Sequence, residues 1–186
     1  MGKKGNETRR MILEAAEELF AQKGFKDVSM SDICTRTGLS RGGLYRYFSS
    51  AADIFRELIS ADYPVADRIA CGDSATDILL DTLDHVEAAI RHSEKSLSLA
   101  IYEFANIGDN RPLFTELEAK ARKRWTALIC YGIRTGEFSV TDPEAAAEMI
   151  LYYYQGLRMW SRVIDMNSKA AENYRHNIIR LLTGGK

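Results

Sequence analysis

The sequence predicts an all-α protein of about nine helices, with a small N-terminal domain followed by a larger helical body. Apolar residues recur at helical spacing along most of the 186 residues, and the alternating runs typical of strands are almost absent. Only three prolines interrupt the chain. We expect the domains to divide into residues 1–50 and 51–186, because the pattern of short helices changes near Ser50.

The first predicted helix covers about residues 7–23, where apolar residues recur on one side and a glycine follows as a stop. The second covers about residues 30–36. Ser29 and Asp32 form a near capping box at its start, and Gly38 ends it. A long first helix followed closely by a short second one is therefore expected.

A third helix is expected over residues 41–48, where Ser40 can cap its first turn. Ser50 and Asp53 repeat the capping pattern before a fourth helix with an apolar stripe. This fourth helix is predicted to leave the small domain and continue toward Pro64.

Five further helices are expected in the body, at about residues 75–92, 94–106, 112–135, 143–164 and 168–183. Pro112 and Pro143 suit a first helical turn, and Thr141 or Asp142 can cap the helix that Pro143 opens.

Charge and composition exclude several classes of protein. The net charge is −1, but residues 1–50 hold nine basic and six acidic residues, whereas the rest holds 16 and 20. A difference of this size can also arise by chance. No run of 18 apolar residues predicts a membrane span, and the polar N-terminus does not resemble a signal peptide. Three widely spaced cysteines favour a reduced, cytoplasmic protein without a zinc site.

The stretch from Ser29 to Phe48 has the layout of a helix-turn-helix, whose second helix enters the major groove of DNA. Arginine suits bidentate contact with guanine, so we expect Arg41, Tyr45 and Arg46 to read sequence. Backbone N–H groups at helix starts suit phosphate contacts. The predicted DNA-contacting residues are Ser29, Met30, Ser31, Arg36, Ser40, Arg41, Gly42, Gly43, Tyr45, Arg46, Tyr47 and Ser50.

Two features of this stretch leave alternatives open. Gly42 and Gly43 destabilise so short a helix, which indicates either close approach of the backbone to DNA or tight packing on a neighbour. Tyr47 suits either a phosphate contact or a place in the small core.

Taken together, residues 8–58 closely resemble the TetR family of bacterial transcriptional regulators. The resemblance is carried by Thr8, Ile12, Ala15, Ala16, Leu19, Phe20, Gly24, Phe25, Val28, Ser29, Met30, Ile33, Thr37, Gly38, Leu39, Ser40, Gly42, Leu44, Tyr45, Tyr47, Phe48 and Phe55. It implies a homodimer on a palindromic operator, usually repressing, that a small ligand in the body releases. Tyr47 and Ala51 depart from the family pattern, which often has histidine and lysine there.

The body supplies candidates for a ligand pocket and for a dimer interface. Pocket candidates combine apolar bodies with polar tips, and each could equally be plain core: Tyr63, His85, Tyr102, Phe104, Trp125, Cys130, Tyr131, Tyr152 and Gln155. The resemblance implies that the last two helices pair with their copies, through Tyr154, Leu157, Trp160, Tyr174, Ile178 and Leu182.

An enzyme is not expected, since the three histidines lack metal-ligand spacing and no nucleophile or phosphate-loop motif is present. We predict no catalytic residue, metal ligand or cofactor. The alternative to a regulator is a helical protein that binds a small molecule and whose DNA module has lost function. Salt-dependent duplex binding separates the two.

Overall fold

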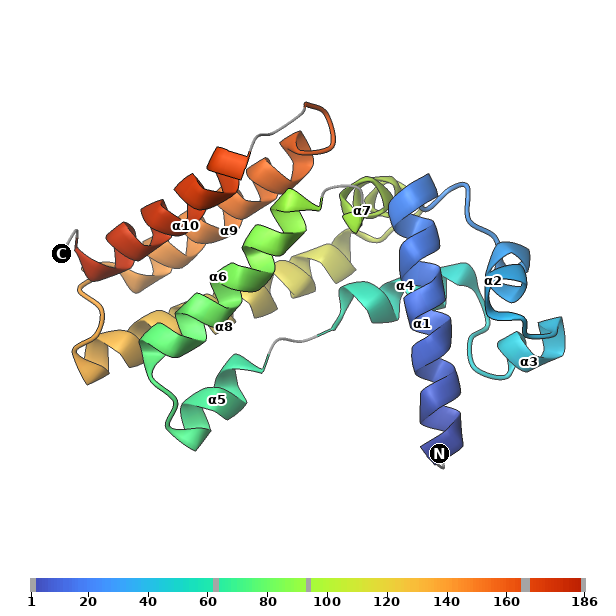
Figure 1. Ribbon diagram of the computed structural model, residues 1–186, viewed down its shortest axis with the longest axis horizontal. Helices are drawn as coiled ribbons and strands as arrows, with labels where there is room; N and C mark the ends of the chain where they lie inside the picture. Colours follow the sequence, from blue (N-terminus) through green and yellow to red (C-terminus); the bar gives the residue numbers. More distant parts are fainter. Residues whose placement is uncertain (1–2, 62–63, 93–94, 165–167, 185–186) are drawn as a thin grey trace. The chain divides into compact units, whose positions relative to one another are not determined.

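The computed structural model describes residues 3–61, 64–92, 95–164 and 168–184, and these residues form ten helices without a strand (Figure 1). The helices are α1 (Lys3–Lys23), α2 (Met30–Thr37), α3 (Arg41–Tyr45), α4 (Ala51–Ile59), α5 (Val65–Cys71), α6 (Ala75–Arg91), α7 (Ser98–Ala105), α8 (Arg111–Thr135), α9 (Pro143–Trp160) and α10 (Ser168–Thr183). The predicted all-helical fold is confirmed.

The sequence prediction missed α5 and placed three helix ends too far along the chain. Helix α4 ends at Ile59, with Ser60 as its C-cap, and does not continue toward Pro64. Helix α5 has only seven residues and no side-chain hydrogen bond at its N-cap, Pro64, so neither periodicity nor capping marks it. Helix α3 ends at Tyr45 rather than residue 48, and α9 ends at Trp160 rather than residue 164. Helix ends are set by local caps and packing more than by apolar spacing.

Helices α1 to α4 and α7 form one compact unit. Helix α1 packs against α2, α4 and α7, and α2 packs against α3. Ile12, Phe20, Ile33, Leu44 and Phe55 are fully buried in this unit. By packing, α4 and α7 therefore belong with the first three helices, whereas the functional division at residue 50 stays a prediction.

Helices α5, α6, α8, α9 and α10 form the second unit. Helix α9 packs along α8 and α10, and α6 contacts α8 and α10 (Figure 1). Gly132 of α8 permits close packing, because a Cβ atom there would lie 2.2 Å from the ring of Phe138. Among the described residues, no helix is long and apolar enough to cross a membrane.

Candidate nucleic-acid interface

The start of α2 is fixed by the predicted capping box. The backbone N–H of Asp32 donates to Oγ of Ser29 (3.2 Å), and the backbone N–H of Ser29 donates to Oδ2 of Asp32 (2.9 Å). Hydrogen bonds from Ser29 lower the pKa of Asp32. Ser31, in the first turn, is exposed, and Met30 is half-buried. The first turn of α2 is thus held in one position at the surface.

The turn between α2 and α3 depends on Gly38. Its φ of +71° lies in the left-handed region that favours glycine, and its N–H donates to the carbonyl of Cys34 (2.9 Å). Ser40 then caps α3 by accepting from the N–H of Gly43 (3.1 Å). The two caps fix the angle at which α3 follows α2.

Helix α3 has a buried side and an exposed side. Leu44 is fully buried, whereas Arg41, Tyr45 and Arg46 are exposed, Tyr45 by 52%. The exposed residues present two guanidinium groups and a phenol between positions 41 and 46. Such a surface suits contacts with base edges and phosphates.

The two glycines of α3 differ in their surroundings. A Cβ atom at Gly42 would have no atom within 4 Å beyond its own local backbone, so close packing on a neighbour is the wrong interpretation there. A Cβ atom at Gly43 would lie 3.2 Å from Oγ of Ser40, the cap of the same helix. Close approach of the backbone to DNA remains the prediction for Gly42.

Tyr47 lies half-buried at the edge of the unit. Its hydroxyl accepts from Nη2 of Arg46 (3.2 Å), and the Arg46 guanidinium lies 5.2 Å from the ring centroid. Hydrogen bonding with Thr8 and then with Arg46 lowers the pKa of Tyr47. Tyr47 therefore holds the guanidinium of Arg46 in one position. The sequence motif alone did not indicate this contact.

Two arginines are held by glutamates of other helices. Arg36 of α2 pairs with Glu18 of α1, and both side chains are about half exposed at 54%. Arg9 of α1 pairs with Glu57 of α4, where Nε donates to Oε1 (2.8 Å). The Arg9 guanidinium also lies 4.3 Å from the ring centroid of Phe48. Arg9 therefore links α1 to α4 and to the ring of Phe48.

The start of α4 forms only half of the second predicted capping box. Ser50 accepts from the N–H of Asp53 (3.1 Å), but the Asp53 carboxylate meets the hydroxyl of Ser49 instead of the backbone of Ser50. These hydrogen bonds, that of Ser49 first, lower the pKa of Asp53. Ala51 begins the helix and is half-buried.

The predicted pocket residues do not come together. Tyr102 and Phe104 belong to α7 in the first unit, where Tyr102 is 60% exposed and Phe104 is 2% exposed. Phe104 packs on Phe25 and Phe55, with ring centroids 4.7 and 5.1 Å away. It is therefore core of the helix-turn-helix unit and not a wall of the body's pocket.

The other pocket candidates are spread over the second unit. His85, Cys130, Tyr152 and Gln155 are exposed, and Tyr63 lies outside the described residues. The Tyr131 hydroxyl donates to the carbonyl of Asp73 (3.0 Å). Trp125 alone of the described candidates lines a small cavity of about 60 Å³, together with Val65, Thr82, Arg124 and Leu128.

Half of the predicted dimer residues are core. Tyr174, Ile178 and Leu182 are at most 2% exposed, because α10 turns them toward its own unit. Tyr154 and Leu157 are half-buried, and Trp160 is 56% exposed. A face of α9 carries further exposed apolar residues that were not among the predicted dimer residues, namely Met149, Tyr152, Tyr153 and Met159, followed by Val163 and Ile164 beyond the helix end.

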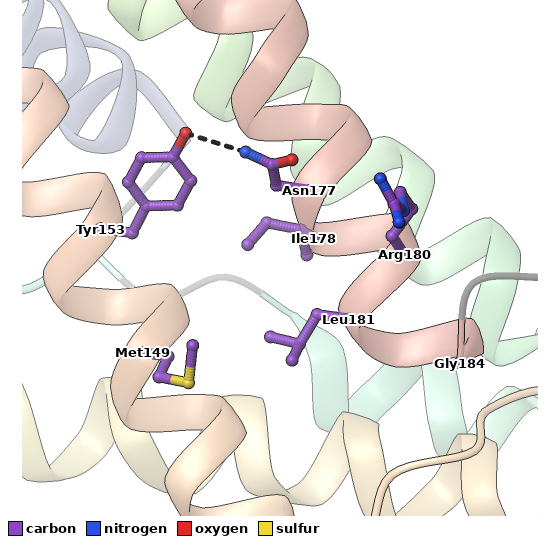
Figure 2. Close-up of a pocket in the computed structure, with 7 residues that line it drawn as sticks. All are labelled: Met149, Tyr153, Asn177, Ile178, Arg180, Leu181 and Gly184. Atoms are coloured by element: carbon purple, nitrogen blue, oxygen red, sulfur yellow. Dashed lines mark hydrogen bonds between the residues drawn. The ribbon is translucent and has the colours of Figure 1, made fainter.

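Two grooves run along this face. In the first, of about 610 Å³, Met149 and Tyr153 of α9 face Asn177 and Leu181 of α10, and Nδ2 of Asn177 donates to the Tyr153 hydroxyl (3.3 Å; Figure 2). The second, of about 520 Å³, is lined by Tyr152, Tyr153, Gly156, Leu157, Trp160 and Ile164. Contiguous apolar surface of this kind is typical of an interface.

No group of His, Cys, Asp or Glu that could hold a metal ion occurs among the residues that the structure describes. The polar chemistry of the first unit is that of exposed cations, hydroxyls and helix starts. Such a surface can bind a polyanion.

Comparison with known proteins agrees with this geometry. Residues 12–58 match the profile of the bacterial regulatory proteins of the tetR family. The chain is 31% identical over 142 residues to the uncharacterized HTH-type transcriptional regulator YfiR of Bacillus subtilis, covering 72% of this chain and 69% of that protein.

A second relative and a solved structure extend the likeness. The A-factor receptor protein of Streptomyces griseus is 26% identical over 178 residues, which cover 91% of this chain and 62% of the receptor. The crystal structure of a TetR transcription regulator from Haloarcula marismortui superposes with a TM-score of 0.72 at 19% identity, covering 95% of this chain and 97% of that one. The likeness in fold therefore extends beyond the helix-turn-helix.

Proposed function

Since the chain belongs to the TetR family and is a helix-turn-helix transcriptional regulator, we propose that it is a cytoplasmic repressor that binds a palindromic operator as a homodimer. A small-molecule effector held by the second unit releases it from DNA. The family consists of regulators rather than enzymes, so catalysis has no part in this function. The observation that carries the proposal is the exposed side of α3, which is capped at its start and anchored by a buried leucine.

The geometry supports DNA reading by α3 and positioning by the helix starts. Arg41 and Arg46 are exposed beside Gly42, where the backbone is open to close approach. Helix α2 starts at the surface behind the Ser29 cap, and anions bind favourably at helix starts. We infer that α3 enters the major groove and that α2 and α4 contact phosphates.

The apolar face of α9 supports the homodimer. Tyr152, Tyr153 and Trp160 are exposed by 57%, 36% and 56%, an unusual state for three large rings on one helix. A second copy related by a two-fold axis presents the same face, so one self-complementary surface covers both. The dimer also sets two α3 helices at a fixed spacing, as a palindromic operator requires.

The small cavity beside Trp125 is the candidate site for the effector. The cavity beside Trp125 has about 60 Å³, whereas ligand pockets usually exceed about 300 Å³. Its walls combine apolar side chains with the polar side chains of Thr82 and Arg124. An effector that widens the cavity would therefore make both apolar and hydrogen-bonding contacts. The relative from Streptomyces griseus is named a receptor, which is consistent with a sensing body.

Duplex binding tests the proposal. The full chain should bind DNA from upstream of its own gene at about 50 mM salt and lose affinity steeply toward about 200 mM. Replacing one base-reading arginine, in Arg41→Ala, should weaken specific binding about tenfold, because a bidentate contact contributes about 1–3 kcal/mol. Lys120→Ala removes the same charge from the second unit and should leave binding unchanged. A chain that binds no duplex at low salt would instead be a small-molecule binder whose DNA module has lost function.

A further inference from the structure

The turn that joins α1 to α2 is held by a carboxylate from a distant part of the sequence. The backbone N–H groups of Phe25 and Lys26 both donate to Oε2 of Glu103 on α7, at 2.6 and 3.1 Å. These two donors follow the end of α1 and have no place in its helical ladder. We propose that Glu103 is a positioning residue for DNA reading, an inference that rests on the proposed function.

The carboxylate is itself fixed in place. Phe104, the next residue, is inserted beside Phe25 and Phe55, and Ala100 one turn earlier is fully buried. Helix α7 also packs on α1. Helix α7 is therefore buried just before Glu103, at Ala100, and just after it, at Phe104. This burial fixes the position of Glu103 at the turn.

The contact between Glu103 and the turn requires a glycine at position 24. A Cβ atom at position 24 would lie 2.5 Å from Oε2 of Glu103, closer than any side chain tolerates. The φ of Gly24 is also +82°, which favours glycine. The turn can bring its two N–H groups to the carboxylate only because position 24 has no side chain.

The turn determines where α2 begins. Three residues after Lys26 comes Ser29, the cap of α2, and α2 in turn packs on α3. With the two N–H groups released, the turn keeps the contact of the Phe25 ring with Phe104 but loses the hydrogen bonds that fix its backbone on α7. The angle of α2 and α3 on α1 then becomes less defined. Base contacts depend on that angle more than phosphate contacts do.

The test compares full-length wild type with Glu103→Ala and Glu103→Gln on a duplex selected by the wild type and on a scrambled duplex. Glu103→Ala should reduce the preference for the selected duplex about tenfold and leave the slope of affinity against salt unchanged. Glu103→Gln should restore most of the preference, since its amide oxygen can accept both hydrogen bonds. Asp109→Ala, an exposed change in the same unit, removes one negative charge and should behave as the wild type.

Hydrogen exchange separates positioning from a general loss of stability. Glu103→Ala should accelerate exchange at the amides of Phe25 and Lys26 while the amides in the middle of α1 and α4 keep their protection. Uniformly faster exchange, or an unchanged DNA preference, overturns the proposal. If the wild type selects no DNA, the proposed function fails, and unchanged exchange at the two turn amides would refute the role of Glu103 separately.

Discussion

Replacing Phe104 by alanine should destabilise the helix-turn-helix unit, although the residue lies far from it in sequence. The ring is 2% exposed, and a buried phenylalanine removes about 150–250 Å² from water. At about 25 cal/mol per Å² this burial contributes at most about 4–6 kcal/mol. Measured losses for such truncations are about 3–5 kcal/mol, a large part of a typical domain's stability.

Tyr102→Ala provides the matched control, because Tyr102 lies two residues earlier on α7 and is 60% exposed. It should change the free energy of unfolding by less than about 0.5 kcal/mol. Urea unfolding followed by circular dichroism gives the loss, and amide exchange in α1 and in α8 assigns it to one unit or the other. A loss of less than about 1 kcal/mol for Phe104→Ala, or a loss of amide protection in α8, would contradict the place of Phe104 in the core of the helix-turn-helix unit.

Three further changes test other parts of the structure. Ala51→Lys should tighten binding to specific and random duplexes alike and steepen the salt slope by about one unit, because it adds one phosphate contact; an unchanged affinity at low salt argues against α4 lying near the DNA backbone. Trp160→Ala should weaken the dimer at least tenfold in sedimentation experiments with little effect on monomer stability, since the ring is already exposed; an unchanged dimer would move the interface elsewhere. Burial acts to raise the pKa of Glu137, but hydrogen bonds from Thr76, Thr135 and Ala75 outweigh it and lower the pKa to about 2. Glu137→Gln should therefore lower the free energy of unfolding in full above about pH 4.5, and the difference from the wild type should disappear as the pH falls toward 2. A difference that does not vary with pH would contradict this.

The helix-turn-helix could be predicted closely from sequence because its signals are local. Ser29, Gly38 and Ser40 each act within four residues of their own position, through caps and a left-handed turn. Their hydrogen bonds depend little on the rest of the chain. For the same reason α5, which has no side-chain cap, could not be predicted.

The site's long-range contacts could not be predicted in the same way. Glu103 meets the turn at Phe25 across 78 positions of sequence, and Arg9 meets Glu57 across 48. Apolar spacing places such residues on a helix but does not say which helix they face. Tyr174 shows the same limit, because its apolar ring suits a core and an interface equally, and packing places it in the core.

Selection of bound fragments from random DNA by the full-length chain tests the central claim most directly. We expect a palindrome whose half-sites lie about one helical turn or a multiple of it apart. We also expect Arg41→Ala to relax the base preference within each half-site without changing the spacing of the half-sites. Recovery of no preferred sequence, or of a single half-site without symmetry, would contradict the claim that this chain reads DNA as a two-fold dimer.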